Sequence, residues 1–308
     1  MRRTRLSLLV LLFAAACAGG PAPEEDRRYG PTERVLETVA VLEKAVRDDT
    51  YRYRPSRDIT GKNIYRASFE RLERLEDAFG DKLRSGYMLD VFLFAKGRAL
   101  ERIGEYDLAA KSYQRVGEMN TPLQEAAGQG RGFCERLLAA RVLQPEPLAT
   151  PDAALEVFGR RTSQLEKLLT DAGETHYSFV AREELEQTDM ARARYFAARR
   201  VLDPRLDALA LQQYQRLVEN HAASKNRLRN LVALGDQYCT LARDYAGRVP
   251  SQSLAFDPAT FDEYSFGCTR ILESVAQQDG EVEKVEATRK LEAFIAFQLQ
   301  VYDERMPR

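Results

Sequence analysis

Residues Leu93 to Pro122 have the sequence LFAKGRALERIGEYDLAAKSYQRVGEMNTP, from which the predicted fold follows. Gly104 marks a turn between two short helical segments. Gly97 and Ala109 are small enough to let the two helices approach closely, and the ring of Tyr113 can fill the space beside them. The stretch therefore predicts a helical hairpin.

The same residues resemble one tetratricopeptide repeat, a helical hairpin with the pattern W-x2-L-G-x2-Y, then A-x3-F, then Pro, over about 34 residues. Its positions are occupied in order by Leu93, Lys96, Gly97, Leu100, Ala109, Tyr113 and Pro122, the last one residue late. A single repeat cannot bury its apolar face alone. The resemblance therefore implies further hairpins that stack on this one.

Two weaker copies of the pattern follow later in the chain. The first has its small and aromatic positions at Ala198, Ala210 and Tyr214, and the second is carried by Leu231, Leu234, Gly235 and Tyr238. The junction between them, YQRLVENHAASK, resembles the turn between repeats in periplasmic tetratricopeptide lipoproteins such as that of the β-barrel assembly machine. We expect an all-α, degenerate solenoid of helical hairpins, with about eleven helices and no strand.

The N-terminus has the pattern of a secreted, lipid-anchored protein. Residues 1–16 combine a basic start with an apolar run, which is typical of a signal peptide. Three alanines directly before Cys17 resemble the bacterial lipobox, which implies that Cys17 becomes lipidated. Ala18, after the cysteine, favours the periplasmic face of the outer membrane by the same resemblance. The alternative is an ordinary signal peptide with an incidental cysteine.

Composition divides the remaining chain. Residues 17–31 are rich in Gly, Pro and charge and are expected to form a flexible tether. The segment 144–151, QPEPLATP, contains three prolines and is the best candidate boundary within the body. It separates an N-terminal helical unit, 32–143, from a C-terminal one, 152–308.

Three cysteines remain besides Cys17. Cys239 and Cys268 fall at similar heights on two neighbouring antiparallel helices, so a disulfide between them is geometrically plausible. The alternative is a pair of buried thiols that pack as small apolar residues. Cys134 has no predicted partner.

No motif predicts catalysis, a cofactor or a metal site. The two histidines belong to no metal-binding or nucleophile pattern, and no basic block predicts nucleic-acid binding. The glycines of GQGRG, at 128–132, lack the flanking strand of a dinucleotide fingerprint and predict close helix packing or a local weakness in the helix instead. The acidic cluster Glu183, Glu184 and Glu186 predicts a solvated helix face.

These patterns predict a non-catalytic adaptor that binds a protein of the cell envelope in a concave groove. By repeat register the groove residues are Tyr87, Asp90, Phe94, Arg98, Asn230, Asp236 and Gln237. One alternative is a cell-envelope enzyme or small-ligand binder with a pocket between two helical lobes. Another is a structural subunit with a large apolar surface patch.

Overall fold

The computed structural model describes residues 30–48, 63–86 and 88–305, and every regular element in these ranges is helical. The predicted all-α hairpin fold is confirmed by the eleven α-helices in these ranges. In chain order they are α2 (Pro31–Asp48), α3 (Ile64–Ser85), α4 (Leu89–Ile103), α5 (Tyr106–Gly117), α6 (Gln124–Val142), α7 (Pro151–Ala172), α8 (Tyr177–Arg199), α9 (Asp207–Asn220), α10 (Arg227–Arg248), α11 (Pro258–Ala276) and α12 (Glu283–Arg305), with a short 3-10 helix, η3 (Pro204–Leu206), before α9.

Local signals explain where several helices begin. The side chains of Asn63, Thr150 and Asp257 each accept a hydrogen bond from a backbone N–H in the first turn of α3, α7 and α11. Such caps satisfy N–H groups that have no partner within the helix. Pro151 and Pro258 stand at the start of α7 and α11, where the missing N–H of proline costs nothing.

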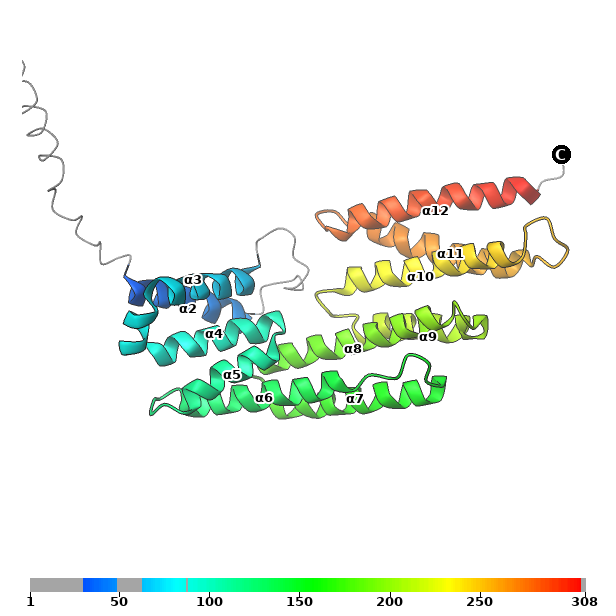
Figure 1. Ribbon diagram of the computed structural model, residues 1–308. Helices are drawn as coiled ribbons and strands as arrows, with labels where there is room; N and C mark the ends of the chain where they lie inside the picture. The colour runs from blue at the N-terminus through cyan, green and yellow to red at the C-terminus, as the bar shows by residue number, and fades with distance from the viewer. Residues whose placement is uncertain (1–29, 49–62, 87, 306–308) are drawn as a thin grey trace, which may run out of the picture.

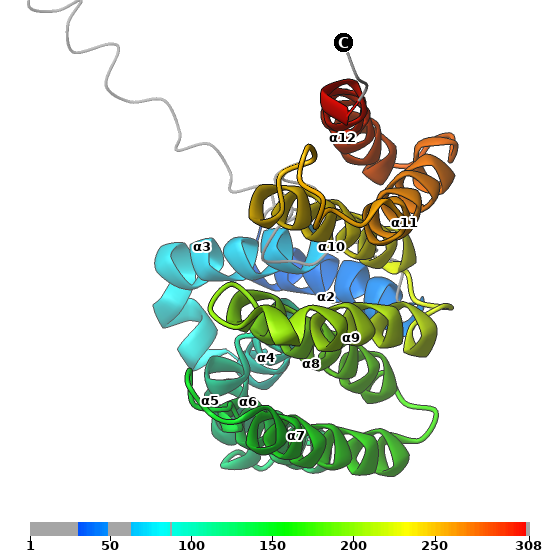
Figure 2. The same cartoon turned by 90° about the vertical axis from the view of Figure 1, so that its right-hand side faces the viewer.

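The helices stack as a curved array rather than a closed bundle. From α2 and α3 the chain descends to α6 and α7, and then climbs through α8 and α10 to α12 (Figures 1 and 2). Each helix packs against its successor, and α2, α6 and α10 also contact α4, α8 and α12, respectively. Because alternate helices approach each other on the inner side of a curved stack, the even-numbered helices line that side.

The hydrophobic core continues from one hairpin to the next. Its largest cluster runs from α2 to the first half of α8, a second joins α8, α9 and α10, and a third joins α10, α11 and α12. The largest cluster includes Leu137 of α6 and Leu165 of α7, so it crosses the proline-rich segment 144–151. The division of the body at that segment therefore stays a prediction, across which apolar packing is continuous.

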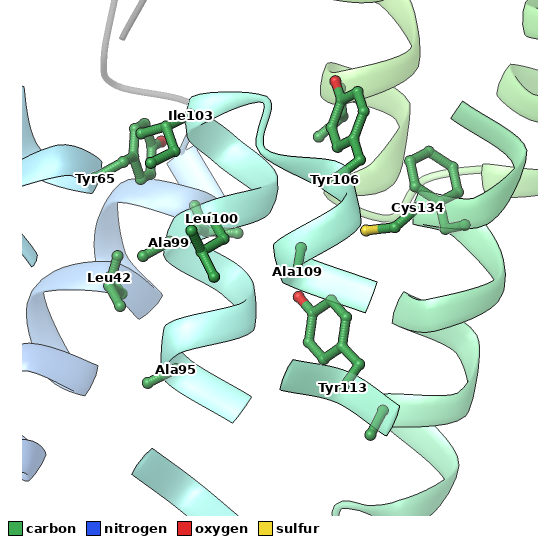
Figure 3. Close-up of a cluster of buried hydrophobic side chains, with 14 of the residues drawn as sticks. Leu42, Tyr65, Ala95, Ala99, Leu100, Ile103, Tyr106, Ala109, Tyr113 and Cys134 are labelled. Carbon is green, nitrogen blue, oxygen red and sulfur yellow. The ribbon is translucent and has the colours of Figure 1, made fainter. Parts of the chain in front are cut away.

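Tyr113 of α5 is the tightest packing point of the predicted hairpin. Its side chain is fully buried in the cluster that Figure 3 draws, next to Ala109 on the same helix. A Cβ atom on Gly97 of α4 would lie 2.7 Å from the ring, and one on Gly130 of α6 would lie 2.9 Å from it. Both glycines are therefore needed for α4 and α6 to close on the ring. Gly104 ends α4 with a φ of 83°, as a turn glycine should.

The two weaker copies of the repeat are built differently. Gly235 of α10 lies against Leu272 of α11, where a Cβ atom would come within 2.9 Å. Tyr238 is half-buried and packs on Gly267 of α11, a glycine that the repeat pattern does not contain. Close approach of α10 and α11 thus depends on one glycine from each helix.

Ala198 does not fill the small packing position that the register assigned to it. It is exposed, because the helical period of α8 turns Ala193 and Phe196 toward the core instead. Ala210 and Tyr214 of α9 are buried as predicted. The repeat offsets therefore hold within α9 but not between α8 and α9.

Cys239 of α10 and Cys268 of α11 form a disulfide, with their Cα atoms 5.0 Å apart. Both side chains belong to the cluster shared by α10, α11 and α12. Cys134 of α6 is a buried free thiol. Cys17 lies outside the described residues.

The glycine contacts predict opposite effects on stability for alanine substitutions at Gly130 and Gly132, which both lie in α6. Gly130→Ala should lower the free energy of unfolding by about 1–3 kcal/mol, because the methyl group would overlap the Tyr113 ring. Gly132→Ala should be neutral or stabilising by up to about 1 kcal/mol, since nothing lies within 4 Å of its added Cβ. Urea denaturation of both variants measures the difference, and equal effects would contradict the packing account.

The disulfide predicts a redox-dependent stability. Cys239 and Cys268 close a loop with a sequence separation of 29, so reduction should lower the free energy of unfolding by roughly 3.5 kcal/mol. Denaturation with and without a reductant tests this, and a Cys239→Ala, Cys268→Ala variant is the control that should not respond. A response of that variant equal to the wild type would exclude the disulfide as the cause.

Candidate functional site

Three of the predicted groove residues, Asp90, Phe94 and Arg98, belong to α4 and are half-buried. Tyr87 lies outside the described residues, and the carboxylate of Asp90 accepts a hydrogen bond from the Thr121 hydroxyl. Phe94 packs edge-on against Tyr113, with ring centroids 5.5 Å apart. Arg98 stacks over Phe94 at 5.1 Å. These side chains are half-buried and hold α4 in place, so they do not form an open binding surface.

Of the other predicted groove residues, Asn230 is buried, whereas Asp236 and Gln237 line a pocket. Asn230 is only 2% exposed and donates to Glu186 Oε1 at 2.6 Å, so its prediction as an open groove residue is wrong. It is buried because the Glu186 carboxylate needs donors in the interior. Asp236 and Gln237 do line a pocket on the inner side of the stack.

A first buried network surrounds Glu101 of α4. The Tyr113 hydroxyl donates to Glu101 Oε2 at 2.9 Å, and Nε2 of His176 lies 3.2 Å from Oε1. Burial raises the pKa of Glu101, while Arg98 and the Tyr113 hydrogen bond oppose the rise. The carboxylate is fully enclosed and both of its oxygens have partners.

His176 lies between Arg98 and Glu101. Arg98 Nη1 lies 3.1 Å from Nδ1 of the ring. Burial, with the nearby charges of Arg98 and Arg102, lowers the pKa of His176 to about 2. The ring is therefore neutral at pH 7, and its contact with Glu101 is a hydrogen bond rather than an ion pair.

A second network surrounds Glu184 of α8 and ties that helix to α5 and α6. Oε1 accepts hydrogen bonds from the Tyr106 hydroxyl at 2.9 Å and from Arg141 Nη2 at 2.7 Å. Arg161 of α7 lies 3.8 Å from Oε2. Arg141 also donates to the carbonyl of Gly104 at 2.7 Å. The charge of Glu184 thus holds side chains of α5, α6 and α7 at one point.

A third network joins α8 to the loop between α9 and α10. Glu186 accepts from Ser224 at 2.8 Å and from Asn226 at 3.1 Å through Oε2. Asp189 lies 3.1 Å from Nε2 of His221, and Arg192 lies 2.9 Å from its other oxygen. The loop is fixed to α8 by these polar contacts.

The prediction of a solvated acidic face on α8 is therefore wrong. Glu184 is 1% exposed and Glu186 is 7% exposed, and each is saturated by donors from neighbouring elements. One signal could have revealed this. Residues 177–199 have no continuous apolar stripe. If a helix with this sequence is surrounded by other helices, it must bury polar side chains.

Three pockets lie along α8. One, of about 590 Å³, lies between α7, α8 and the α9–α10 loop and is lined mainly by apolar surface around Leu169, Phe179 and Leu185. A second, of about 340 Å³, is lined by α8, α10 and α12, with Tyr214 of α9. A third, of about 450 Å³, lies at α6, α7 and α8 and shares Met190 and Arg194 with the second.

The described residues contain little reactive chemistry. In them no group of His, Cys, Asp and Glu side chains is arranged to hold a metal ion. Burial raises the pKa of Cys134 well above its usual value, which keeps that thiol protonated. None of the described helices combines the length and apolar character that crossing a bilayer requires.

Comparison with known proteins adds no assignment. No family model matches the chain, and none of the curated proteins compared with it matches either.

The neutral state of His176 predicts a pH-dependent contribution to stability. An unfolded histidine has a pKa of about 6.5, so the contribution is present above pH 6.5 and is lost as the pH falls toward the folded value. Between pH 7 and pH 5 the stability advantage of the wild type over His176→Gln should shrink by about 1–2 kcal/mol. Urea denaturation at both pH values measures it, and a constant difference would contradict the buried neutral ring.

Proposed function

We propose that this protein is a membrane-anchored periplasmic lipoprotein that binds other proteins of the cell envelope as a non-catalytic adaptor. The observation that carries the proposal is the row of pockets along α8, two of which are lined mainly by the even-numbered helices of the inner side of the stack. Stacks of this kind use their concave side to hold extended segments of a partner.

The buried ionisable groups support binding rather than catalysis. Glu101, Glu184 and Glu186 each have their carboxylate oxygens engaged by protein donors. A general acid or base must reach the proton of a substrate, and these groups reach only their neighbours. Their arrangement stabilises the fold around the pockets.

The membrane anchor rests on the sequence pattern alone. Cys17 and the tether lie outside the described residues, so the support is the basic and apolar run of residues 1–16 and the alanines before Cys17. If Cys17 is lipidated, several acyl chains would hold the protein far more firmly than a single chain can.

One observation favours the alternative of a small-ligand binder. The largest of these pockets, of about 590 Å³, has the size of a typical small-molecule site and combines an apolar lining with His221 and Glu186. Both polar side chains already have protein partners, Asp189 for His221 and Ser224 for Glu186. We therefore rank this alternative second.

Site-specific photocrosslinking in intact cells tests the adaptor. A photoreactive residue in place of Arg194, which lines two of the pockets, should trap a partner protein. The same residue in place of Arg216, an exposed position on α9 outside these pockets, is the matched control. Equal trapping at both positions, or none at Arg194, would contradict a concave binding surface.

Cell fractionation tests the anchor separately. Cys17→Ser should move the protein from the membrane fraction to the soluble periplasmic fraction, because the lipid attachment point is lost. Retention of the variant in the membrane fraction would exclude Cys17 as the anchor and would leave the crosslinking result unaffected.

A further inference from the structure

The pocket between α8, α10 and α12 contains two arginines whose charge is not matched. Arg194 of α8 and Arg229 of α10 form no ion pair with any residue in the described part of the chain. The third cation, Lys290 of α12, lies 2.8 Å from Asp236 and 3.8 Å from Glu286. The two acidic groups of the pocket are thus engaged by the lysine, and the arginines are left for another anion.

Two buried donors in the same pocket also lack acceptors. Gln237 of α10 is only 6% exposed, and its Nε2 has no hydrogen-bond partner. Nη1 of Arg229 is buried and likewise has none. An unmet buried donor costs roughly 1–3 kcal/mol. An acceptor oxygen supplied by a ligand would remove this cost.

The neighbouring pocket contains further arginines. Arg194 also lines the neighbouring pocket at α6, α7 and α8, to which Arg141 and Arg161 contribute. Among the described residues, the acidic side chain that lies within ion-pair distance of these two arginines is Glu184. The arginines of the neighbouring pocket therefore add positive charge close to Arg194.

We propose that the pocket at Arg194, Arg229 and Gln237 binds a carboxylate. A guanidinium presents two parallel N–H groups that match the two oxygens of a carboxylate, and the amide of Gln237 adds a neutral donor. A phosphate dianion fits less well, because Asp236 and Glu286 line the same pocket and repel a second negative charge.

The source of the carboxylate is inferred from the proposed adaptor function, on which this part of the proposal rests. A pocket of about 340 Å³ accepts a side chain or a small molecule but not a folded domain. In an adaptor the occupant is an Asp or Glu side chain of an extended partner segment. A free dicarboxylate has the same chemistry and is distinguished by experiment.

Calorimetric titration of the full chain at low ionic strength is the test. The probes are an acetylated and amidated Gly-Ser peptide with one central Glu, the same peptide with Gln in place of Glu, succinate, and inorganic phosphate. The Glu peptide should bind at least about tenfold more tightly than the Gln peptide, since a charge-assisted hydrogen bond is lost in the latter.

Variants connect the binding to the pocket. Arg229→Gln and Arg194→Gln should each weaken binding of the Glu peptide by about tenfold or more, whereas Arg216→Gln on the exposed face of α9 should not change it. Circular dichroism confirms that each variant is folded. Unchanged affinity in folded Arg194→Gln and Arg229→Gln, absence of binding, or tighter binding of phosphate than of either carboxylate probe would overturn the proposal.

The outcome separates the carboxylate site from the adaptor. Succinate that binds more tightly than the Glu peptide, and that depends on both arginines, supports the carboxylate site and overturns a partner side chain as its source. Crosslinked partners at position 194 together with arginine-independent peptide binding support the adaptor and overturn the carboxylate site.

Discussion

The stack depends on the enclosure of one tyrosine. The ring of Tyr113 is held between Gly97 and Gly130, so a larger side chain at either position would overlap the ring and push α4 or α6 away from α5. Its hydroxyl donates to Glu101, a carboxylate that has no exposed surface of its own. A larger side chain at Gly97 or Gly130 would overlap the ring, and a smaller side chain in place of Tyr113 would leave a void and an unpaired buried carboxylate at Glu101. Each of these defects is costly in a close-packed interior.

Buried polar contacts specify the orientation of neighbouring hairpins, which apolar packing alone does not determine. Along α8, Glu184 and Glu186 bind donors from α5, α6, α10 and the loop before α10. Buried charges of this kind contribute little net stability compared with apolar side chains, but a misplaced neighbour leaves them unpaired. We infer that these contacts define how the hairpins before and after α8 are oriented, and hence the shape of the pockets beside it.

The position of those pockets follows from this arrangement. Carboxylates at the centre of α8 are saturated, while Arg194 near its C-terminal end and Arg229 across from it are not. The carboxylates of α8 are thus paired in the interior, while the positive charges of Arg194 and Arg229 remain on the concave side. An adaptor that selects a partner by an acidic side chain would use that excess, and the apolar pocket beside Leu169 and Phe179 would add contact area.

From the amino-acid pattern one can predict the helical class, the hairpin around Gly97, Ala109 and Tyr113, and the matching heights of Cys239 and Cys268. Each of these features depends on a period within one or two neighbouring helices. The pattern did not determine that Ala198 is exposed or that Glu184, Glu186 and Asn230 are buried. Whether a polar residue of a helix meets water or another helix depends on segments distant in sequence, here α5, α6 and the loop before α10. Which charges stay unpaired follows from the three-dimensional arrangement of the helices, because pairing requires that helices distant in sequence lie next to each other.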